Sequence, residues 1–278
     1  QFLSEKGIGS IERLDSLWRK ENIILRVKAG KNQYVFKKIN SEDKASEPER
    51  VKLLVEAYPD LMPKIYLFEG NAYLMEYISG NSFFNLKNGQ RIEKIAEAGK
   101  SLREIHQFEQ RARKDISDKI LASFQKYRAK RAKFFQENEL KQEDIDFSIF
   151  ASVPDNPSHN DLNAANLLYT KKGIRFIDPS EEGYNDIARD VGRYCASCFF
   201  NNYDYFGQDR VYSLDIASAF LSNFDPETSG RAKYYLGESF LSFMGFDTVS
   251  TPKSTLKTLA TNMLTKKGGI LKILEESL

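Results

Sequence analysis

The sequence predicts an α+β protein with two lobes: a small N-terminal lobe built on an antiparallel sheet, and a larger, mainly helical C-terminal lobe. Short apolar strands separated by turn residues occupy most of the first part of the chain. From about residue 90 onward, apolar residues recur at helix spacing instead. We therefore expect residues 1–79 to form one lobe and residues 80–278 the other. A chain of 278 residues can bury a substantial core.

The composition is that of an ordinary globular protein. Hydrophobic residues make up 41% of the chain and charged residues 29%, both within the usual range. The formal net charge of +2 gives no reason to expect binding to nucleic acid or to a membrane surface. No apolar run approaches the ~18 residues of a membrane-spanning helix, and no signal-peptide pattern is present.

The two cysteines, Cys195 and Cys198, form a lone C-x-x-C in an apolar segment with helical character. Such a pair can indicate redox chemistry or half of a zinc site, but a second pair of ligands is absent from the sequence. Buried structural thiols are the better interpretation. Together with the composition, this predicts a protein of the reducing cytoplasm.

Strands are expected over most of residues 8–39. One lies near residues 11–17, a second begins at Ile23, and a third covers residues 33–39 after the turn at Gly30-Lys31-Asn32. Two further strands lie within residues 64–78 and are joined at Gly70-Asn71, which is a hairpin signal.

A helix is predicted between these two groups of strands. Ser46 and Glu49 form a capping box, and Pro48 lies early in the first turn. Four residues give the helix one apolar face: Val51, Leu54, Val55 and Tyr58.

The remainder of the chain is predicted to be mainly helical. The first helix has an apolar face formed by Ile92, Ile95, Ala98 and Leu102. Further helical segments are expected at residues 111–138, 209–224, 230–243 and 253–277, with Gly and Pro residues between or within them.

The stretch from Ser158 to Arg193 contains the most specific pattern in the chain. His159, Asp161 and Asn166 follow the spacing His-x-Asp-x-x-x-x-Asn, and Asp178 ends the second strand of the short hairpin that follows. This is the catalytic arrangement of kinases, in which one carboxylate orients the attacking hydroxyl. The Asn and the second Asp hold Mg²⁺. The alternative is a solvated polar loop before a strand, but a chance match is rare in a chain with only two histidines.

A kinase also needs a lysine on a strand, directed at the α- and β-phosphates of ATP. Lys37 is the candidate, since it shares a strand face with the smaller Val35; Lys38 on the opposite face is the alternative. A helix glutamate should fix this lysine. Glu47 lies on the apolar face of the predicted helix, whereas Glu49 is better explained by the capping box.

The strand that ends at residue 78 is the candidate hinge for the adenine base. By position, the carbonyl of Glu76 and the amide of Ile78 would form hydrogen bonds with the adenine edge. An ordinary buried strand leading into a linker explains the same residues.

The segment where a kinase binds phosphates is unusual. It should lie at Trp18–Asn22, which contains no glycine, and Gly7-x-Gly9 comes too early in the chain. Arg19, Lys20 or the side chain of Asn22 could take the place of the glycine backbone.

Taken together, these motifs resemble the aminoglycoside phosphotransferase and choline kinase superfamily, which are kinases of small molecules with a bilobal protein-kinase-like fold. The resemblance covers roughly residues 10–245. His159-Asn160-Asp161 is similar to the family's H-[GN]-D, and His106 matches its helix-ending L-x-x-L/I-H. Asp178, Gly183-Tyr184-Asn185 and Asp190 fall at the spacing found in choline kinases. The departures are Pro179 after the metal Asp, Ala164-Ala165 where Pro-Gly is frequent, and the glycine-free phosphate loop.

The resemblance implies a role for each matching residue. Asp161 would be the catalytic base or orienter, and Asn166 and Asp178 would be the Mg²⁺ ligands. Lys37 would contact the phosphates of ATP and Glu47 would fix Lys37. His159 and Asp190 would support the loop. The implied reaction is ATP- and Mg²⁺-dependent transfer of the γ-phosphoryl group to a hydroxyl of a small molecule.

Two other functions are open on the sequence. A protein kinase is disfavoured because only eleven residues separate Asp178 from Asp190, with no A-P-E-like sequence for a peptide-binding segment. A nucleotide-binding pseudokinase would explain the missing glycines, but not the intact His-x-Asp-x-x-x-x-Asn motif.

The acceptor is the least determined part of the prediction. Choline would need an aromatic cage, and the single Trp18 lies in the wrong lobe for one. Six other aromatic residues are candidates, although core packing explains most of them: Tyr194, Phe199, Phe200, Tyr203, Tyr205 and Phe206. Glu181, Glu182 and Asp186 would suit an aminoglycoside or an amino alcohol, or belong to a solvated loop; a neutral sugar is also open. The sequence indicates no oligomeric state.

Overall fold

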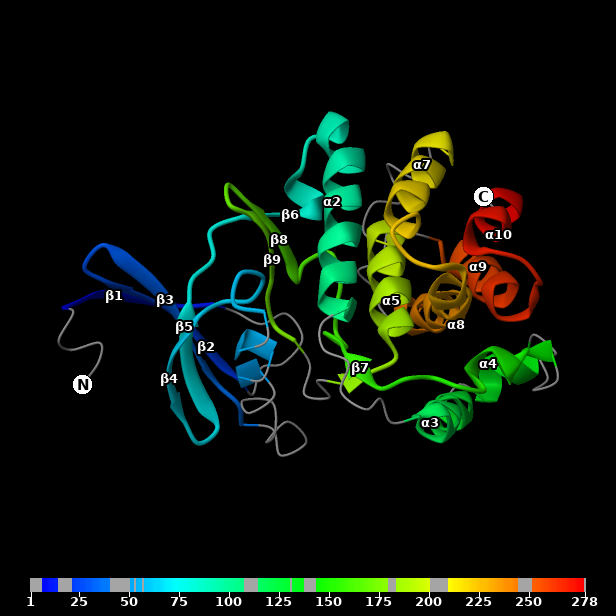
Figure 1. Ribbon diagram of the computed structural model, residues 1–278, viewed down its shortest axis with the longest axis horizontal. Helices are drawn as coiled ribbons and strands as arrows, with labels where there is room; N and C mark the ends of the chain where they lie inside the picture. The colour runs from blue at the N-terminus through cyan, green and yellow to red at the C-terminus, as the bar shows by residue number, and fades with distance from the viewer. Residues whose placement is uncertain are drawn as a thin grey trace. The chain divides into compact units, whose positions relative to one another are not determined.

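The computed structural model has a five-stranded antiparallel sheet in the first part of the chain and a mainly helical remainder with a few short strands, which confirms the α+β prediction (Figure 1). It describes residues 7–14, 22–40, 51–52, 54–56, 58–107, 115–130, 132–137, 144–179, 184–200, 210–244 and 252–277.

Two compact units make up the chain. The first contains Gln1–Asn81 together with Asn166–Gly183, and the second contains Ser82–Ala165 together with Tyr184–Leu278. The expected lobe boundary at residue 79 stays a prediction. The first unit also includes Asn166–Gly183, which lies much later in the chain.

A five-stranded antiparallel sheet forms most of the first unit. Its order is β1-β2-β3-β5-β4, and its strands are β1 (Ile8–Arg13), β2 (Ile23–Ala29), β3 (Asn32–Lys38), β4 (Ile65–Glu69) and β5 (Ala72–Glu76). Gly30 and Gly70 adopt positive φ angles of 59° and 56° in the two hairpin turns, a conformation that glycine adopts without strain. The predicted strands are therefore present, although β1 begins and ends earlier than expected.

One face of this sheet carries a buried apolar cluster. Val27, Ala29, Tyr34 and Leu74 form it, with Leu25 and Phe36 packed against them. On the opposite face of β3, Val35 and Lys37 are also buried. Residues 51–52 and 54–56 are helical, and Val51 and Leu54 are buried as expected.

A hairpin from later in the chain completes the first unit. It consists of β8 (Leu167–Thr170) and β9 (Gly173–Phe176), and together with β6 (Asn81–Ser82) it forms a sheet of order β6-β8-β9. The amide of Phe176 donates to the carbonyl of Leu61 at 2.7 Å. This bond ties β9 to the segment that precedes β4.

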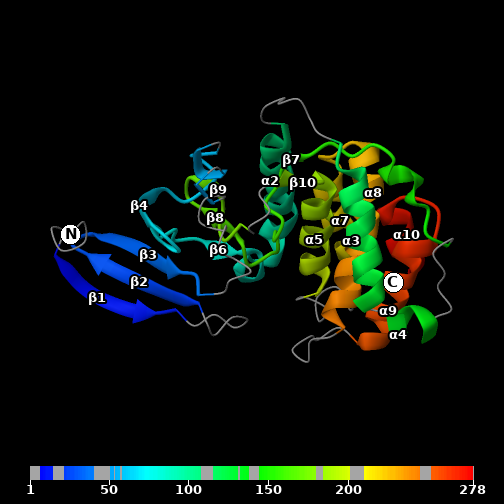
Figure 2. The same cartoon turned by 90° about the horizontal axis from the view of Figure 1, so that it is seen from below.

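Helices make up most of the second unit (Figure 2). They are α2 (Asn88–Gln107), α3 (Ser117–Lys130), α4 (Ala132–Glu137), α5 (Ile187–Phe200), α7 (Arg210–Leu221), α8 (Pro226–Phe243), α9 (Lys253–Thr265) and α10 (Ile270–Ser277), with the 3₁₀ turns η3 (Phe83–Asn85) and η5 (Phe147–Phe150). The short strands β7 (Asn156–Pro157) and β10 (Tyr184–Asn185) pair antiparallel. Helices α5 and α8 pack side by side.

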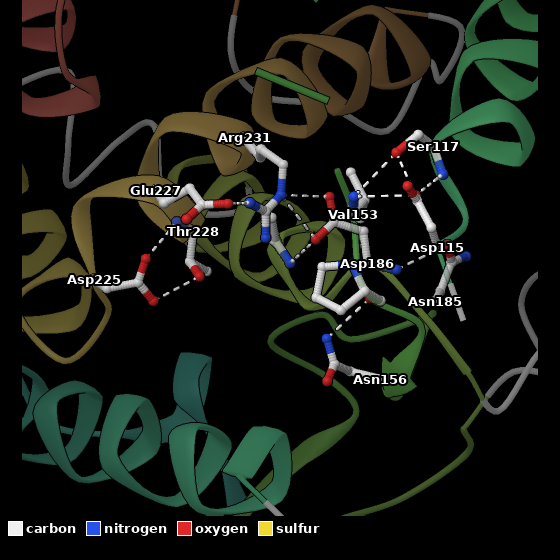
Figure 3. Close-up of polar contacts among 12 residues, drawn as sticks. Asp115, Ser117, Val153, Asn156, Asn185, Asp186, Asp225, Glu227, Thr228 and Arg231 are labelled. Carbon is white, nitrogen blue, oxygen red and sulfur yellow. Dashed lines mark hydrogen bonds and ion pairs between the residues drawn. The ribbon is translucent and has the colours of Figure 1, made fainter. Parts of the chain in front are cut away.

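Two details of the helix prediction are wrong. Ile92 is 37% exposed, so the buried face of α2 consists of Ile95, Ala98, Leu102 and Ile105 without it. The helix expected from residue 111 begins only at Ser117, because Asp115 bridges to Pro154 and accepts hydrogen bonds from the amide and hydroxyl of Ser117 (Figure 3).

Both cysteines are buried and free, which confirms the interpretation as structural thiols. Burial raises the pKa of Cys195 to about 12, so this thiol stays protonated at neutral pH. Within the described part of the chain, no helix combines the length and apolar character that a membrane span requires.

Candidate active site

The loop of residues 158–165 in the second unit carries Asp161 among buried neighbours. Ser158, His159 and Asn160 are buried before it, and Leu162 and Ala164 are buried after it. The side chain of Asp161 itself is 38% exposed. The buried residues therefore hold the loop in the protein, while the Asp161 carboxylate stays accessible to solvent.

Asp190 holds the start of this loop. Its two carboxylate oxygens accept hydrogen bonds from the amides of His159 and Asn160, each at 2.7 Å, and His106 Nε2 lies 3.6 Å away. Burial acts to raise the pKa of Asp190, but the contact with His106 and the charges of His106 and His159 hold it below its ordinary value. Asp190 is thus a buried carboxylate that supports the loop, as the resemblance implies.

Asn160 has a left-handed backbone, with a φ angle of 62°. Glycine adopts this conformation freely, and asparagine is one of the few other residues that tolerate it. This explains physically why Asn replaces Gly in the H-[GN]-D motif. Asp178 also has a positive φ, of 56°, and these are the two such non-glycine residues in the described chain.

Arg193 and Ser197 were missed by the sequence analysis. Arg193 Nη2 donates to Asp161 Oδ1 at 2.8 Å, and Nη1 donates to the carbonyl of Asn160 at 3.1 Å. Ser197 Oγ accepts from the amide of Ala164 at 2.8 Å. Asp190, Arg193 and Ser197 recur at helix spacing on one face of α5, so this polar stripe was the available signal.

In the first unit, Lys37 and Asp178 form an ion pair. The Lys37 side chain is buried, with 5% exposed, whereas the Asp178 side chain is 48% exposed. Lys38, the alternative, lies on the opposite face of β3 and is partly buried. The structure therefore brings Lys37 to the predicted metal-binding Asp, in the same unit.

The register of the β8–β9 hairpin brings Asn166 and Asp178 to one end of it. Leu167 pairs with Phe176, and the amide of Ile177 donates to the carbonyl of Asn166 at 2.9 Å. Asn166 directly precedes β8. Asp178 is the residue directly after Ile177, so Asn166 and Asp178 lie at the same end of the hairpin.

The donor chemistry of this hairpin end fits Mg²⁺, which prefers carboxylate and amide oxygens. Among the described residues, three or more His, Cys, Asp or Glu side chains nowhere gather as a metal cluster. Mg²⁺ in kinases is usually held by one or two protein groups and the phosphates of the substrate. Asn166 and Asp178 would be these protein groups.

The predicted hinge residue Glu76 has partners for both its backbone and its side chain. The amide of Tyr77 donates to Gln33 of β3, whereas the amide of Glu76 donates to Lys64, so the backbone of Glu76 faces away from β3. Arg175 Nη2 donates to Glu76 Oε2 at 2.9 Å. Ile78 follows the end of β5 and is partly buried.

Some predicted residues lie outside the described chain. These are the helix residues Glu47 and Glu49, phosphate-loop residues 18–21, the acidic pair Glu181 and Glu182, and the aromatic acceptor candidates Tyr203, Tyr205 and Phe206. Asn22, at the end of the phosphate loop, is described. It is buried, and its side-chain oxygen accepts from the amide of Asn40 at 3.2 Å.

Asp186 and Tyr194 both lie in the protein interior, so neither can contact an acceptor; for Tyr194 this is the core packing that the sequence also favoured. Asp186 is fully buried and is paired with Arg231, whose Nε lies 3.1 Å from Oδ2, so it is not part of an acidic surface for an amine (Figure 3). Arg231 also pairs with Glu227 at 2.8 Å. Tyr194 is fully buried and packs against Phe220 with ring centroids 4.9 Å apart, so it belongs to the core rather than to an aromatic cage.

Comparison with known protein families shows to which family the chain belongs. The profile of the phosphotransferase enzyme family matches residues 10–225, which is most of the chain and includes both units' candidate residues. The chain belongs to the phosphotransferase enzyme family. This confirms the predicted resemblance and the prediction that the protein is a phosphotransferase.

Solved structures similar to this phosphotransferase include three small-molecule kinases. An ethanolamine kinase from Plasmodium vivax has 15% sequence identity and a TM-score of 0.56, with 96% of this chain and 80% of that chain covered. The choline kinase LicA from Streptococcus pneumoniae has 18% identity and a TM-score of 0.53, with 99% and 93% covered.

The third is the ADP-bound aminoglycoside phosphotransferase APH(2'')-Ib, with 12% identity, a TM-score of 0.53, and 95% and 94% covered. At these identities the likeness shows the fold, which is the predicted kinase-like one. A search of curated protein sequences found no significant match.

Proposed function

We propose that this phosphotransferase transfers the γ-phosphoryl group of ATP to a hydroxyl group of a small molecule, with Mg²⁺ as the metal. The observation that carries the proposal is the pairing of buried Lys37 with Asp178 at the end of the hairpin that also presents Asn166. A cation for phosphates and two oxygen donors for a metal thus lie together in one unit. Such a set is what phosphoryl transfer requires.

Nucleotide binding is assigned mainly to the first unit. Lys37 binds the α- and β-phosphates, and Asn166 and Asp178 hold Mg²⁺, which neutralises charge on the transferred group. Glu47 fixes Lys37. The carbonyl of Glu76 and the amide of Ile78 form hydrogen bonds with the adenine edge; the salt bridge from Arg175 to the Glu76 side chain supports this assignment, because it holds the end of β5 in place.

Asp161 acts on the acceptor. Its carboxylate orients the acceptor hydroxyl and takes its proton while the hydroxyl oxygen forms a bond to the γ-phosphorus. The bond from that phosphorus to the bridging oxygen of ADP breaks, and ADP leaves with the electron pair. Catalysis by positioning and charge neutralisation explains why the site needs so few reactive groups.

The acceptor is an aminoglycoside, an amino alcohol such as choline or ethanolamine, or a sugar. The similar solved structures include kinases of these first two kinds, which supports the choice. The short stretch between Asp178 and Asp190 argues against a protein acceptor. A cytoplasmic location and the absence of nucleic-acid and membrane partners are part of the same proposal.

The experiment is transfer from γ-labelled ATP with Mg²⁺ to separate pools of amino alcohols, aminoglycosides, sugars and a generic protein. Asp161→Asn is the control, and its rate should be about 10²- to 10⁴-fold lower. Transfer to one small-molecule pool, lost in the variant, is the expected result. Transfer to protein alone would instead identify a protein kinase. Nucleotide binding without transfer to any pool would favour a pseudokinase.

A further inference from the structure

We propose that Arg193 is a positioning residue that holds the carboxylate of Asp161 in the orientation needed to receive the acceptor hydroxyl. The proposal rests on the function proposed above for Asp161. It goes beyond that function because it assigns the orientation of Asp161 to a specific side chain of helix α5.

The two hydrogen bonds of Arg193 reach consecutive residues of the loop. One guanidinium nitrogen contacts the carboxylate of Asp161 at 2.8 Å, and the other contacts the carbonyl of Asn160 at 3.1 Å. Because the guanidinium group is planar and rigid, it couples the direction of the Asp161 side chain to the backbone of the loop. A lysine ammonium is a point charge on a flexible stem and lacks this planar fork, so it does not hold the two contacts in the same fixed geometry.

Arg193 projects from a helix that is itself held in place. Asp190, one turn earlier, and Ser197, one turn later, bind the amides of the same loop. Gly192 packs directly against α8, where a Cβ would lie only 2.5 Å from the carbonyl oxygen of Ala232. Helix α5 therefore has little freedom to shift, and Arg193 acts from a rigid support.

The exposure of the pair separates a positioning role from a structural one. The Arg193 and Asp161 side chains are 36% and 38% exposed. Ion pairs exposed to this degree contribute little to the free energy of unfolding, because solvent screens them and replaces their hydrogen bonds. Loss of Arg193 should therefore change catalysis much more than stability.

The kinetic test compares Arg193→Ala and Arg193→Lys with the wild-type protein in the transfer assay. Arg103→Ala is the matched control, since Arg103 is an exposed arginine on α2 of the same unit. We expect kcat of Arg193→Ala to fall about 10- to 100-fold, the cost of a misplaced catalytic group, while KM for ATP changes less than about twofold. Arg193→Lys should recover only part of the loss.

Chemical rescue adds a readout that a structural role would not give. Millimolar guanidinium should restore part of the kcat of Arg193→Ala, and should not help Asp161→Asn, which lacks the carboxylate to be oriented. Melting temperatures of wild type and Arg193→Ala should agree closely. An unchanged kcat in Arg193→Ala would overturn the proposal, and so would a loss of kcat that guanidinium does not reverse at all.

A crystal structure of Arg193→Ala tests the proposal independently of activity. We expect the Asp161 carboxylate to be turned or to occupy several orientations. If Asp161 keeps the orientation seen with Arg193 present, the proposal is wrong. Should the wild-type protein phosphorylate no acceptor, the proposed function fails, and this structure still decides whether Arg193 positions Asp161.

Discussion

The buried charge of Lys37 is compensated by Asp178. An ammonium group with so little contact with water is costly to bury unless it is paired, and Asp178 supplies the opposite charge. In the proposed reaction, the phosphates of ATP provide the negative charge for Lys37 and the metal provides the positive charge for Asp178.

Lys37→Met should lower kcat/KM for ATP by about 100-fold or more, because it removes a charged group that stabilises the transferred phosphoryl. Lys38→Met is the matched control, since Lys38 lies on the other face of the same strand. Its kcat/KM should stay within about threefold of wild type. Equal losses in the two variants would contradict the assignment of Lys37.

Asp190 makes stability depend on pH. Its pKa lies below the ordinary value in the folded protein, because its interactions with the two histidines and the loop amides outweigh burial. A lowered folded pKa stabilises the folded state above the unfolded pKa of about 3.9, and this stabilisation is lost as pH falls through the folded pKa.

Asp190→Asn should therefore be less stable than wild type at pH 7, by about 1–3 kcal/mol for the weakened charged hydrogen bonds. The difference should shrink as pH is lowered below about 4. Urea unfolding at both pH values measures it. A difference that is the same at both would show that the charge of Asp190 does not stabilise the fold.

Helix α5 positions the 158–165 loop. Three polar side chains on one face of α5 bind the loop: Asp190, Arg193 and Ser197. Helix α5 must also pack closely against α8, and Gly192 permits this because it has no Cβ. One helix therefore combines a polar face that positions Asp161 with a small residue that fixes the helix itself.

Gly192→Ala should destabilise the protein by about 1–3 kcal/mol, the usual cost of overpacking. The added Cβ would lie 2.5 Å from the carbonyl oxygen of Ala232 and 2.9 Å from the amide nitrogen of Leu236, and backbone atoms cannot move aside cheaply. Gly89→Ala is the control, because a Cβ there has no atom within 4 Å and alanine favours the helix. Urea unfolding should show a loss for the first variant and none for the second.

Across both units, the parts of the fold that can be predicted from the sequence are those with a local signal. Hairpin turns at Gly30 and Gly70, alternation on β3, and helix periodicity from residue 90 all depend on neighbouring residues, and the structure contains the corresponding elements. The sequence predicts too early a start for α3, because the contact of Asp115 with Pro154 spans a long stretch of sequence and leaves no local signal.

The candidate site shows the same limit. The spacing of Asp161, Asn166 and Asp178 could be seen in the sequence because kinase motifs are local. The contact of Arg193 with Asp161 could not, since it depends on how α5 packs against a distant loop. The burial of Asp186 could not be predicted either, because it depends on Arg231 of α8, which lies far along the chain and pairs with this carboxylate.

The Mg²⁺ dependence of phosphoryl transfer tests the role of Asp178 in wild type, Asp178→Ala and the control Asp60→Ala, since Asp60 is an exposed aspartate of the same unit. We predict transfer that requires Mg²⁺ in wild type and in Asp60→Ala, and that falls to background in Asp178→Ala at every Mg²⁺ concentration. Substantial Mg²⁺-dependent transfer by Asp178→Ala would contradict the central claim that this carboxylate holds the metal of a small-molecule kinase.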